Sequence, residues 1–83
     1  MGLYVEVRDA DTGVAITNAS FNYAFNNYGN GQYWVWAGYN STLVVSASGY
    51  NSVWGSTDGY SYMWAYLKKH VPYSKYSKGS GWT

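Results

Sequence analysis

Apolar and polar residues alternate with a period of two along most of this chain. The clearest such segments are residues 3–8, 21–25, 33–37, 43–48 and 60–67. Because successive side chains of a β-strand point to opposite faces of its sheet, each of these segments is typical of a strand with one buried face. The pattern therefore predicts about five main strands, with a short additional strand near residues 52–54.

The segments between the predicted strands are rich in Gly, Asn, Asp and Ser, the residues that favour turns. They cover residues 9–13, 26–31, 38–40, 49–51 and 55–59. Asn30-Gly31 is the pair that favours a two-residue hairpin turn. Short turns in a chain of 83 residues predict an all-β fold, a small antiparallel Ig-like β-sandwich. We expect a single domain over residues 1–69, followed by a basic, aromatic C-terminal tail over residues 70–83.

Two stretches of sequence carry a resemblance to a known family. The first runs from Val5 through Asp-Ala-Asp-Thr-Gly at residues 9–13 to Phe21, and the second is Leu-Val-Val-Ser-Ala-Ser-Gly-Tyr at residues 43–50. Both are similar to the corresponding strands of carboxypeptidase regulatory-like domains, and the resemblance covers roughly residues 3–68. It implies a transthyretin-like (prealbumin-like) β-sandwich with a non-catalytic accessory or structural role.

Aromatic residues are too numerous for one small core. The chain has eleven Tyr, five Trp and two Phe, but only nine charged residues. Exposed rings are a solubility liability, so their number predicts a contact surface. If Met63, Ala65 and Leu67 face the core, the opposite parity places one set of rings together on the outer face: Tyr4, Trp34, Trp36, Tyr62, Trp64 and Tyr66. The reverse parity would bury the rings of the last strand.

Two functions from different classes would use such a surface. The first is a structural subunit of a repetitive assembly, in a virion or an extracellular filament, whose partners are copies of itself or other proteins of that assembly. The alternative is a carbohydrate-binding module, in which Trp34, Trp36 and Trp54 stack on polysaccharide and Asn side chains bind its hydroxyl groups. A broad outer surface favours assembly, whereas a small cluster of rings favours a glycan site.

The charges are sorted along the chain. All four acidic residues precede position 59, and all four lysines follow it. The tail also carries Tyr73, Tyr76 and Trp82, which join the candidate contact residues. Such a tail is either solvated or docks on the acidic turn at residues 9–13 of a neighbouring copy, and we expect the docking. Four lysines and a net charge of +1 give too little positive charge for the basic surface that nucleic-acid binding needs, so we do not expect this function.

Candidate catalytic and metal-binding groups are scarce. His70 is the only His and there is no Cys, so we assign His70 no role. Asp9-Ala10-Asp11-Thr12-Gly13 lacks the later ligands of a calcium loop and predicts a turn in which side chains bond local backbone. We therefore expect neither an enzyme nor a cofactor.

The expected location is a virion or the outside of a cell. No apolar run approaches the ~20 residues that span a bilayer, and no signal-peptide pattern is visible, so we expect no membrane insertion. Two glycosylation triplets, at residues 18–20 and 40–42, are weakly typical of extracellular proteins.

Overall fold

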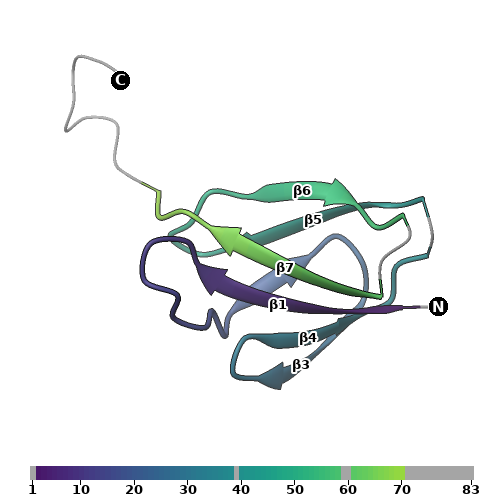
Figure 1. Cartoon of the computed structure of the whole chain (residues 1–83), viewed down its shortest axis with the longest axis horizontal. Coiled ribbons are helices and arrows are strands. Elements are labelled where there is room, and N and C mark those ends of the chain that lie inside the picture. Colours follow the sequence, from purple (N-terminus) through teal and green to yellow (C-terminus); the bar gives the residue numbers. More distant parts are fainter. Residues whose placement is uncertain (1, 39, 59–60, 71–83) are drawn as a thin grey trace, which may run out of the picture.

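The computed structural model describes residues 2–38, 40–58 and 61–70, and strands are its regular elements (Figure 1). In chain order they are β1 (Leu3–Asp9), β2 (Ala19–Phe21), β3 (Phe25–Gly29), β4 (Gln32–Val35), β5 (Thr42–Ala47), β6 (Val53–Ser56) and β7 (Tyr62–Leu67). They form two sheets that enclose one core. The prediction of a small all-β sandwich is confirmed.

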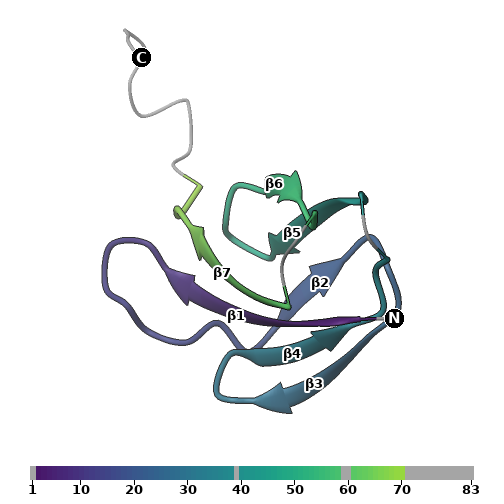
Figure 2. The same cartoon turned by 45° about the vertical axis from the view of Figure 1, so that its right-hand side comes forward.

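The two sheets differ in size and in pairing. A four-stranded sheet has the order β3-β4-β1-β7, and a three-stranded sheet has the order β2-β5-β6 (Figure 2). The predicted antiparallel pairing holds for every pair except β1 and β7, which run parallel. The reason is the route of the chain, which leaves the first sheet after β4, builds β5 and β6 in the second sheet, and crosses back to place β7 beside β1.

The prediction of one strand over residues 21–25 is wrong, because this segment passes from one sheet to the other. β2 pairs with β5, whereas β3 pairs with β4. At the crossing, the side chain of Asn22 bonds β5 in place of backbone: its Nδ2 donates to Thr42 O at 2.9 Å and its Oδ1 accepts from Val44 N at 2.8 Å. The rings at positions 21, 23 and 25 are all half-buried, although β2 and β3 belong to different sheets. Their alternation therefore has the same pattern as a single strand.

The other turn and strand predictions are closer to the structure. The short strand near 52–54 is present as β6. Asn30 and Gly31 connect β3 to β4 with φ angles of 53° and 78°, as a two-residue hairpin turn requires. Gly31 is needed for a second reason, since a Cβ there would lie 2.7 Å from the carbonyl oxygen of Val7.

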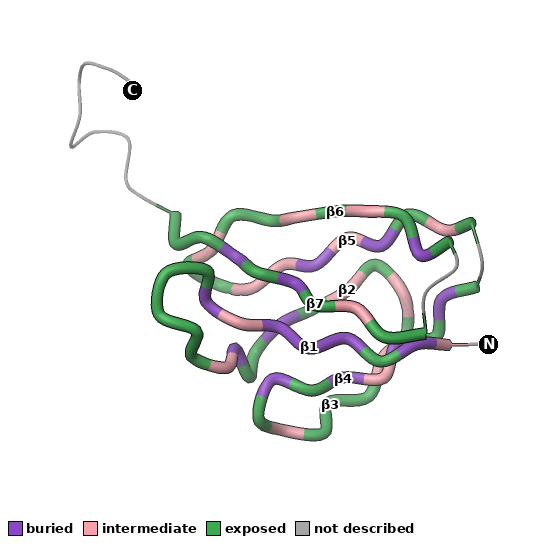
Figure 3. The backbone as a smooth tube through the Cα atoms, viewed as in Figure 1, coloured by how far each residue is buried: buried purple, intermediate pink, exposed green. Residues whose placement is uncertain are grey.

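The core lies between the sheets, and buried residues recur at alternate positions of β4 and β5 and at the end of β7 (Figure 3). Its fully buried hydrophobic side chains from the four-stranded sheet are Leu3, Val5, Val7, Tyr33, Val35 and Leu67. Tyr33 joins the sheets, because its hydroxyl donates to Ile16 O at 2.7 Å and accepts from Ala19 N at 3.0 Å. Leu67 and Ala65 are buried and Met63 packs against the core, so of the two parities that the sequence left open for the last strand, the structure has the one with its rings outside.

After β7 the chain bonds the connection between β5 and β6. Asn51 N donates to Lys68 O and His70 N donates to Gly49 O, both at 2.9 Å, and Tyr50 and Lys69 form an antiparallel bridge between them. Residues 49–51, before β6, are thus hydrogen-bonded to residues 68–70, after β7. This contact fixes the distance between the two sheets at one end of the molecule.

Candidate contact surface

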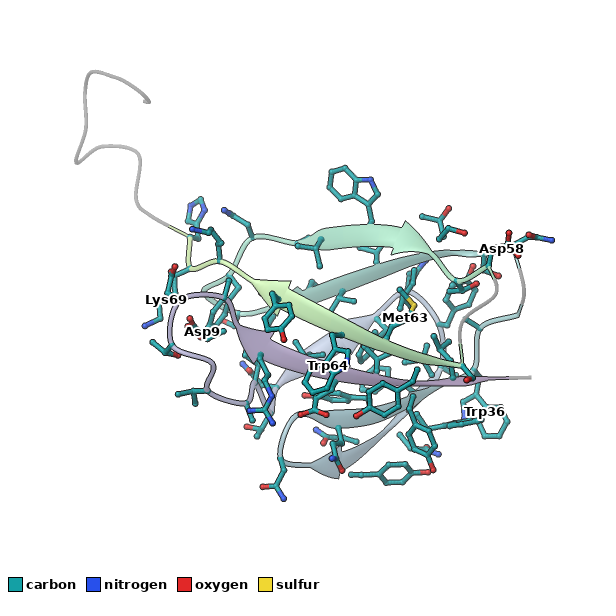
Figure 4. All side chains as sticks on the ribbon, viewed as in Figure 1. Asp9, Trp36, Asp58, Met63, Trp64 and Lys69 are labelled. Carbon is teal, nitrogen blue, oxygen red and sulfur yellow. The ribbon has the colours of Figure 1, made fainter. Side chains whose placement is uncertain are left out.

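The outer side of the four-stranded sheet carries a continuous set of rings, which we call the aromatic face. Its members are Tyr4, Tyr28, Trp34, Trp36, Tyr62, Trp64 and Tyr66. All except the half-buried Trp34 are between 44 and 56% exposed. They face outward because their neighbours in sequence fill the core, as with Met63 and Trp64, which leave β7 on opposite sides (Figure 4).

Tyr4 connects the rings of three other strands. It is in register with Trp34 of β4 on one side and with Tyr62 of β7 on the other. Its ring centroid lies 4.9 Å from that of Trp34 in an edge-to-face contact, 6.2 Å from that of Tyr62, and 6.3 Å from that of Tyr28. Trp36 extends the group, 5.7 Å from Trp34. Such contacts add to the energy of apolar burial and restrict the rings to defined orientations.

The rings of β7 form a row. Trp64 lies 5.9 Å from Tyr62 and 6.3 Å from Tyr66, and the planes of Trp64 and Tyr66 are within 9° of parallel. The guanidinium carbon of Arg8 lies 6.0 Å from the centroid of Trp64, at the limit of a cation–π contact. The row therefore presents two parallel exposed rings with one cation beside them.

Glu6 is a buried carboxylate at the centre of this face. The Tyr62 hydroxyl donates to its Oε1 at 2.6 Å, and Arg8 Nε donates to its Oε2 at 2.9 Å. The hydrogen bond from Tyr62, followed by that from Arg8, lowers the pKa of Glu6, and the same carboxylate raises the pKa of Tyr62. Both oxygens of Glu6 accept hydrogen bonds within the chain, so this ion pair fixes the Tyr62 ring.

Trp34 is held close to the start of the chain. A Cβ added to Gly2 would lie 2.6 Å from the Trp34 ring, so only glycine allows this approach. Within the described part of the chain, the buried Nε1 of Trp34 has no hydrogen-bond acceptor. Its ring is therefore placed by packing against Gly2, Tyr4 and Trp36.

The sequence identified most of the aromatic face but not all of it. The structure brings together the six predicted residues, five of them in β1, β4 and β7 and Trp36 directly after β4. Tyr28 was missed because its segment, residues 26–31, is rich in turn-forming residues. In the structure the register of β3 against β4 shifts between Asn27 and Gly29, and Tyr28 lies beside Tyr4. Glu6 and Arg8 were not selected either, although their alternation with Val5 and Val7 signals the outer face. Tyr73, Tyr76 and Trp82 lie outside the described residues.

Trp54 lies apart from the aromatic face. It belongs to β6 of the other sheet, is in register with Val44, and is 74% exposed. The cluster of Trp34, Trp36 and Trp54 considered for a carbohydrate site is thus divided between the two sheets.

The carboxylates of the acidic turn, residues 9–13, bond groups of the same chain. Asp9 Oδ1 accepts from the backbone N–H groups of Asp11 at 2.8 Å and Thr12 at 3.0 Å, which confirms the predicted turn. Asp9 Oδ2 accepts from the Tyr50 hydroxyl at 2.8 Å. Asp11 forms an exposed ion pair of 3.5 Å with Lys68.

The described residues contain no group of three or more His, Cys, Asp or Glu side chains placed to hold a metal ion. No helix among them is long and apolar enough to cross a membrane.

In the comparisons with known proteins, no family model matches the chain. No curated protein matches it either.

Proposed function

We propose that this protein is a non-enzymatic structural subunit of a repetitive protein assembly, and that copies associate through the aromatic face. The observation that carries the proposal is the continuity of the face. Six exposed rings and one half-buried ring, from four adjacent strands and from Trp36 just after β4, contact one another across the whole sheet.

The chemistry of the face supports a protein partner. Tyr and Trp are enriched at protein interfaces, since they supply large apolar area with few rotatable bonds. Glu6, the one buried charge that the described residues place on the face, is already paired with Arg8, so covering it does not leave an isolated carboxylate. A second copy offers a surface of the same shape, as a two-fold interface requires.

Carbohydrate binding is the second candidate. One observation favours it: the parallel rings of Trp64 and Tyr66 beside Arg8 resemble a stacking platform for a sugar. Two observations favour assembly instead. The face is much broader than this pair of rings, and the polar group at its centre, Glu6, is hydrogen-bonded within the chain.

The setting stays a prediction from the sequence. A virion or an extracellular filament would use a subunit of this kind, and the role of the tail residues Tyr73, Tyr76 and Trp82 between subunits also stays a prediction.

The test compares two exposed tryptophans on opposite sheets. Trp64→Ser removes the central ring of the β7 row, and Trp54→Ser removes a ring that is more exposed but lies outside the aromatic face. Light scattering over a concentration series gives the association constant. We expect Trp64→Ser to weaken association at least tenfold, as for a residue worth about 1.4 kcal/mol or more at an interface, and Trp54→Ser to change it little.

Two results would overturn the proposal. One is a wild-type protein that stays monomeric at millimolar concentration. The other is an equal effect of the two substitutions, which would mean that association does not use the aromatic face. A monomer that is retarded in polysaccharide gels, and released from them by Trp64→Ser, would establish the carbohydrate function in its place.

A further inference from the structure

The two sheets leave an opening between β6 and β7, which we call the window. It has a volume of about 340 Å³. Its inner lining comes from core strands and includes Val5, Leu43 and Val45, while Trp54, Trp64 and Tyr66 are the exposed rings among its lining residues. The window is thus an apolar site with an aromatic rim, the usual character of a pocket that binds an apolar group.

The window arises because two strands separate after starting as a pair. Residues 49–51 and 68–70 are hydrogen-bonded in antiparallel register. Continued in the same register, that pairing would place Val53 opposite Tyr66 and Gly55 opposite Trp64. These residues line the window instead, and no strand pairing joins β6 to β7 in the described part of the chain. Both strands therefore present an unpaired edge to the opening.

Gly55 leaves the inner side of the window open. It is in register with the buried Leu43, so a side chain there would point inward. A Cβ added to Gly55 would have no atom within 4 Å, and its φ is not positive, so backbone strain does not require glycine. A larger residue would fill the opening from inside, which makes Gly55 the position from which its occupancy can be controlled.

We propose that the window binds a tyrosine side chain of the chain's own segment 71–83, Tyr73 or Tyr76. His70 is bonded to Gly49, beside the end of the window nearer to Val53. The following residues carry rings within a few positions, and an apolar cavity of about 150 Å³ already holds a benzene-sized ring.

The segment is long enough to reach. Val53 is four residues from Gly49, a distance of about 13 Å along an extended chain. Tyr76 is six residues beyond His70, and an extended chain of that length spans about 20 Å. Tyr73 is three residues beyond His70, a span of about 10 Å, and its side chain is long enough to cover the remainder of the ~13 Å. A segment tethered next to its site also has a high effective concentration there, which favours the same chain over a neighbouring copy.

The first experiment measures proximity directly. The chain has no cysteine, so Ser77→Cys provides a single attachment point for a nitroxide label. We expect selective broadening of the amide signals of Val53, Gly55 and Tyr66 at a concentration where light scattering shows a monomer. The control sample mixes chains that carry the nitroxide but no ¹⁵N with ¹⁵N chains that carry no nitroxide. In this sample we expect no such broadening.

The second experiment is a double-mutant cycle read by thermal unfolding of the full chain. In the wild type, Tyr73→Ser with Tyr76→Ser should lower the unfolding midpoint by about 4 °C or more. In a Gly55→Val background the same pair should have little effect, because the window is already filled. Tyr28→Ser, which removes an exposed ring far from the window, should have the same effect in both backgrounds.

Each possible result decides the proposal. Broadening confined to the window in the labelled chain, together with a non-additive cycle, supports it. Broadening that persists in the mixed sample assigns the window to the tail of a neighbouring copy and overturns the proposal. Absence of broadening at the window overturns it as well, whether or not Gly55→Val folds. The window shares Trp64 and Tyr66 with the aromatic face. The label, the cycle and its control leave both of these residues in place, so this proposal and the assembly function fail separately.

Discussion

Asp9 shows how one buried side chain connects distant parts of the molecule. It ends β1, and its carboxylate binds the backbone of the following turn and the hydroxyl of Tyr50 in the loop before β6. These bonds, that from Tyr50 first, lower the pKa of Asp9 from 3.8 to about 2. The carboxylate therefore stabilises the fold only while it is ionised.

We expect this residue to make the fold sensitive to acid. Because the pKa of Asp9 is lower in the folded than in the unfolded chain, its contribution to stability is complete above about pH 4 and is lost as the pH falls toward 2. The unfolding midpoint, measured by circular dichroism, should fall over this range. In Asp9→Asn the fall should be shallower, and Glu6, whose pKa is also lowered, should account for part of what remains.

Tyr50→Phe is the companion variant, since it removes the largest cause of the shift and leaves the carboxylate in place. Its slope between pH 4 and 2 should lie between those of the wild type and Asp9→Asn. A slope unchanged by both substitutions would show that Asp9 does not carry the acid sensitivity.

At the scale of strands, the crossing at Asn22 depends on one amide side chain. Asn22 supplies β5 with the two hydrogen bonds described above, at the point where the backbone leaves the sheet. Asn22→Ala should lower the free energy of unfolding by about 1–2 kcal/mol, since two exposed hydrogen bonds are lost. Urea unfolding measures the change. Asn18→Ala, an exposed asparagine that precedes β2, is the control, and an equal loss there would contradict the prediction.

The alternation of side chains predicts which residues of one strand share a face, but it left open which face of the last strand is buried. In the structure Ala65 and Leu67 are buried together with the aliphatic residues of β1 and β4, so the rings of β7 lie on the aromatic face. Alternation gives the wrong prediction over residues 21–25, because the apolar and polar positions continue to alternate while the chain changes sheet at Asn22. It also cannot identify a parallel partner, so the β1–β7 pair and the window beside it were not predicted.

At the scale of the whole molecule, two sources of association can be separated by salt. The aromatic face is an apolar surface with an internally paired Glu6 and Arg8, whereas a basic tail on an acidic turn would be an attraction between exposed charges. Salt screens exposed charges strongly, with a Debye length of about 10 Å at 0.1 M and about 3 Å at 1 M, but does not weaken apolar burial.

We therefore expect association of copies to stay constant or strengthen as sodium chloride is raised from about 0.1 to 1 M, at fixed pH 7. The acidic turn gives the physical reason why charge is secondary: Asp9 is buried and hydrogen-bonded, and Asp11 already has Lys68 of its own chain beside it. Sedimentation velocity at both salt concentrations measures the change, with Lys68→Gln as the matched variant that frees Asp11. A tenfold or greater weakening of the wild type at high salt would instead assign the contact between copies to the tail and the turn, and would remove the aromatic face from the interface.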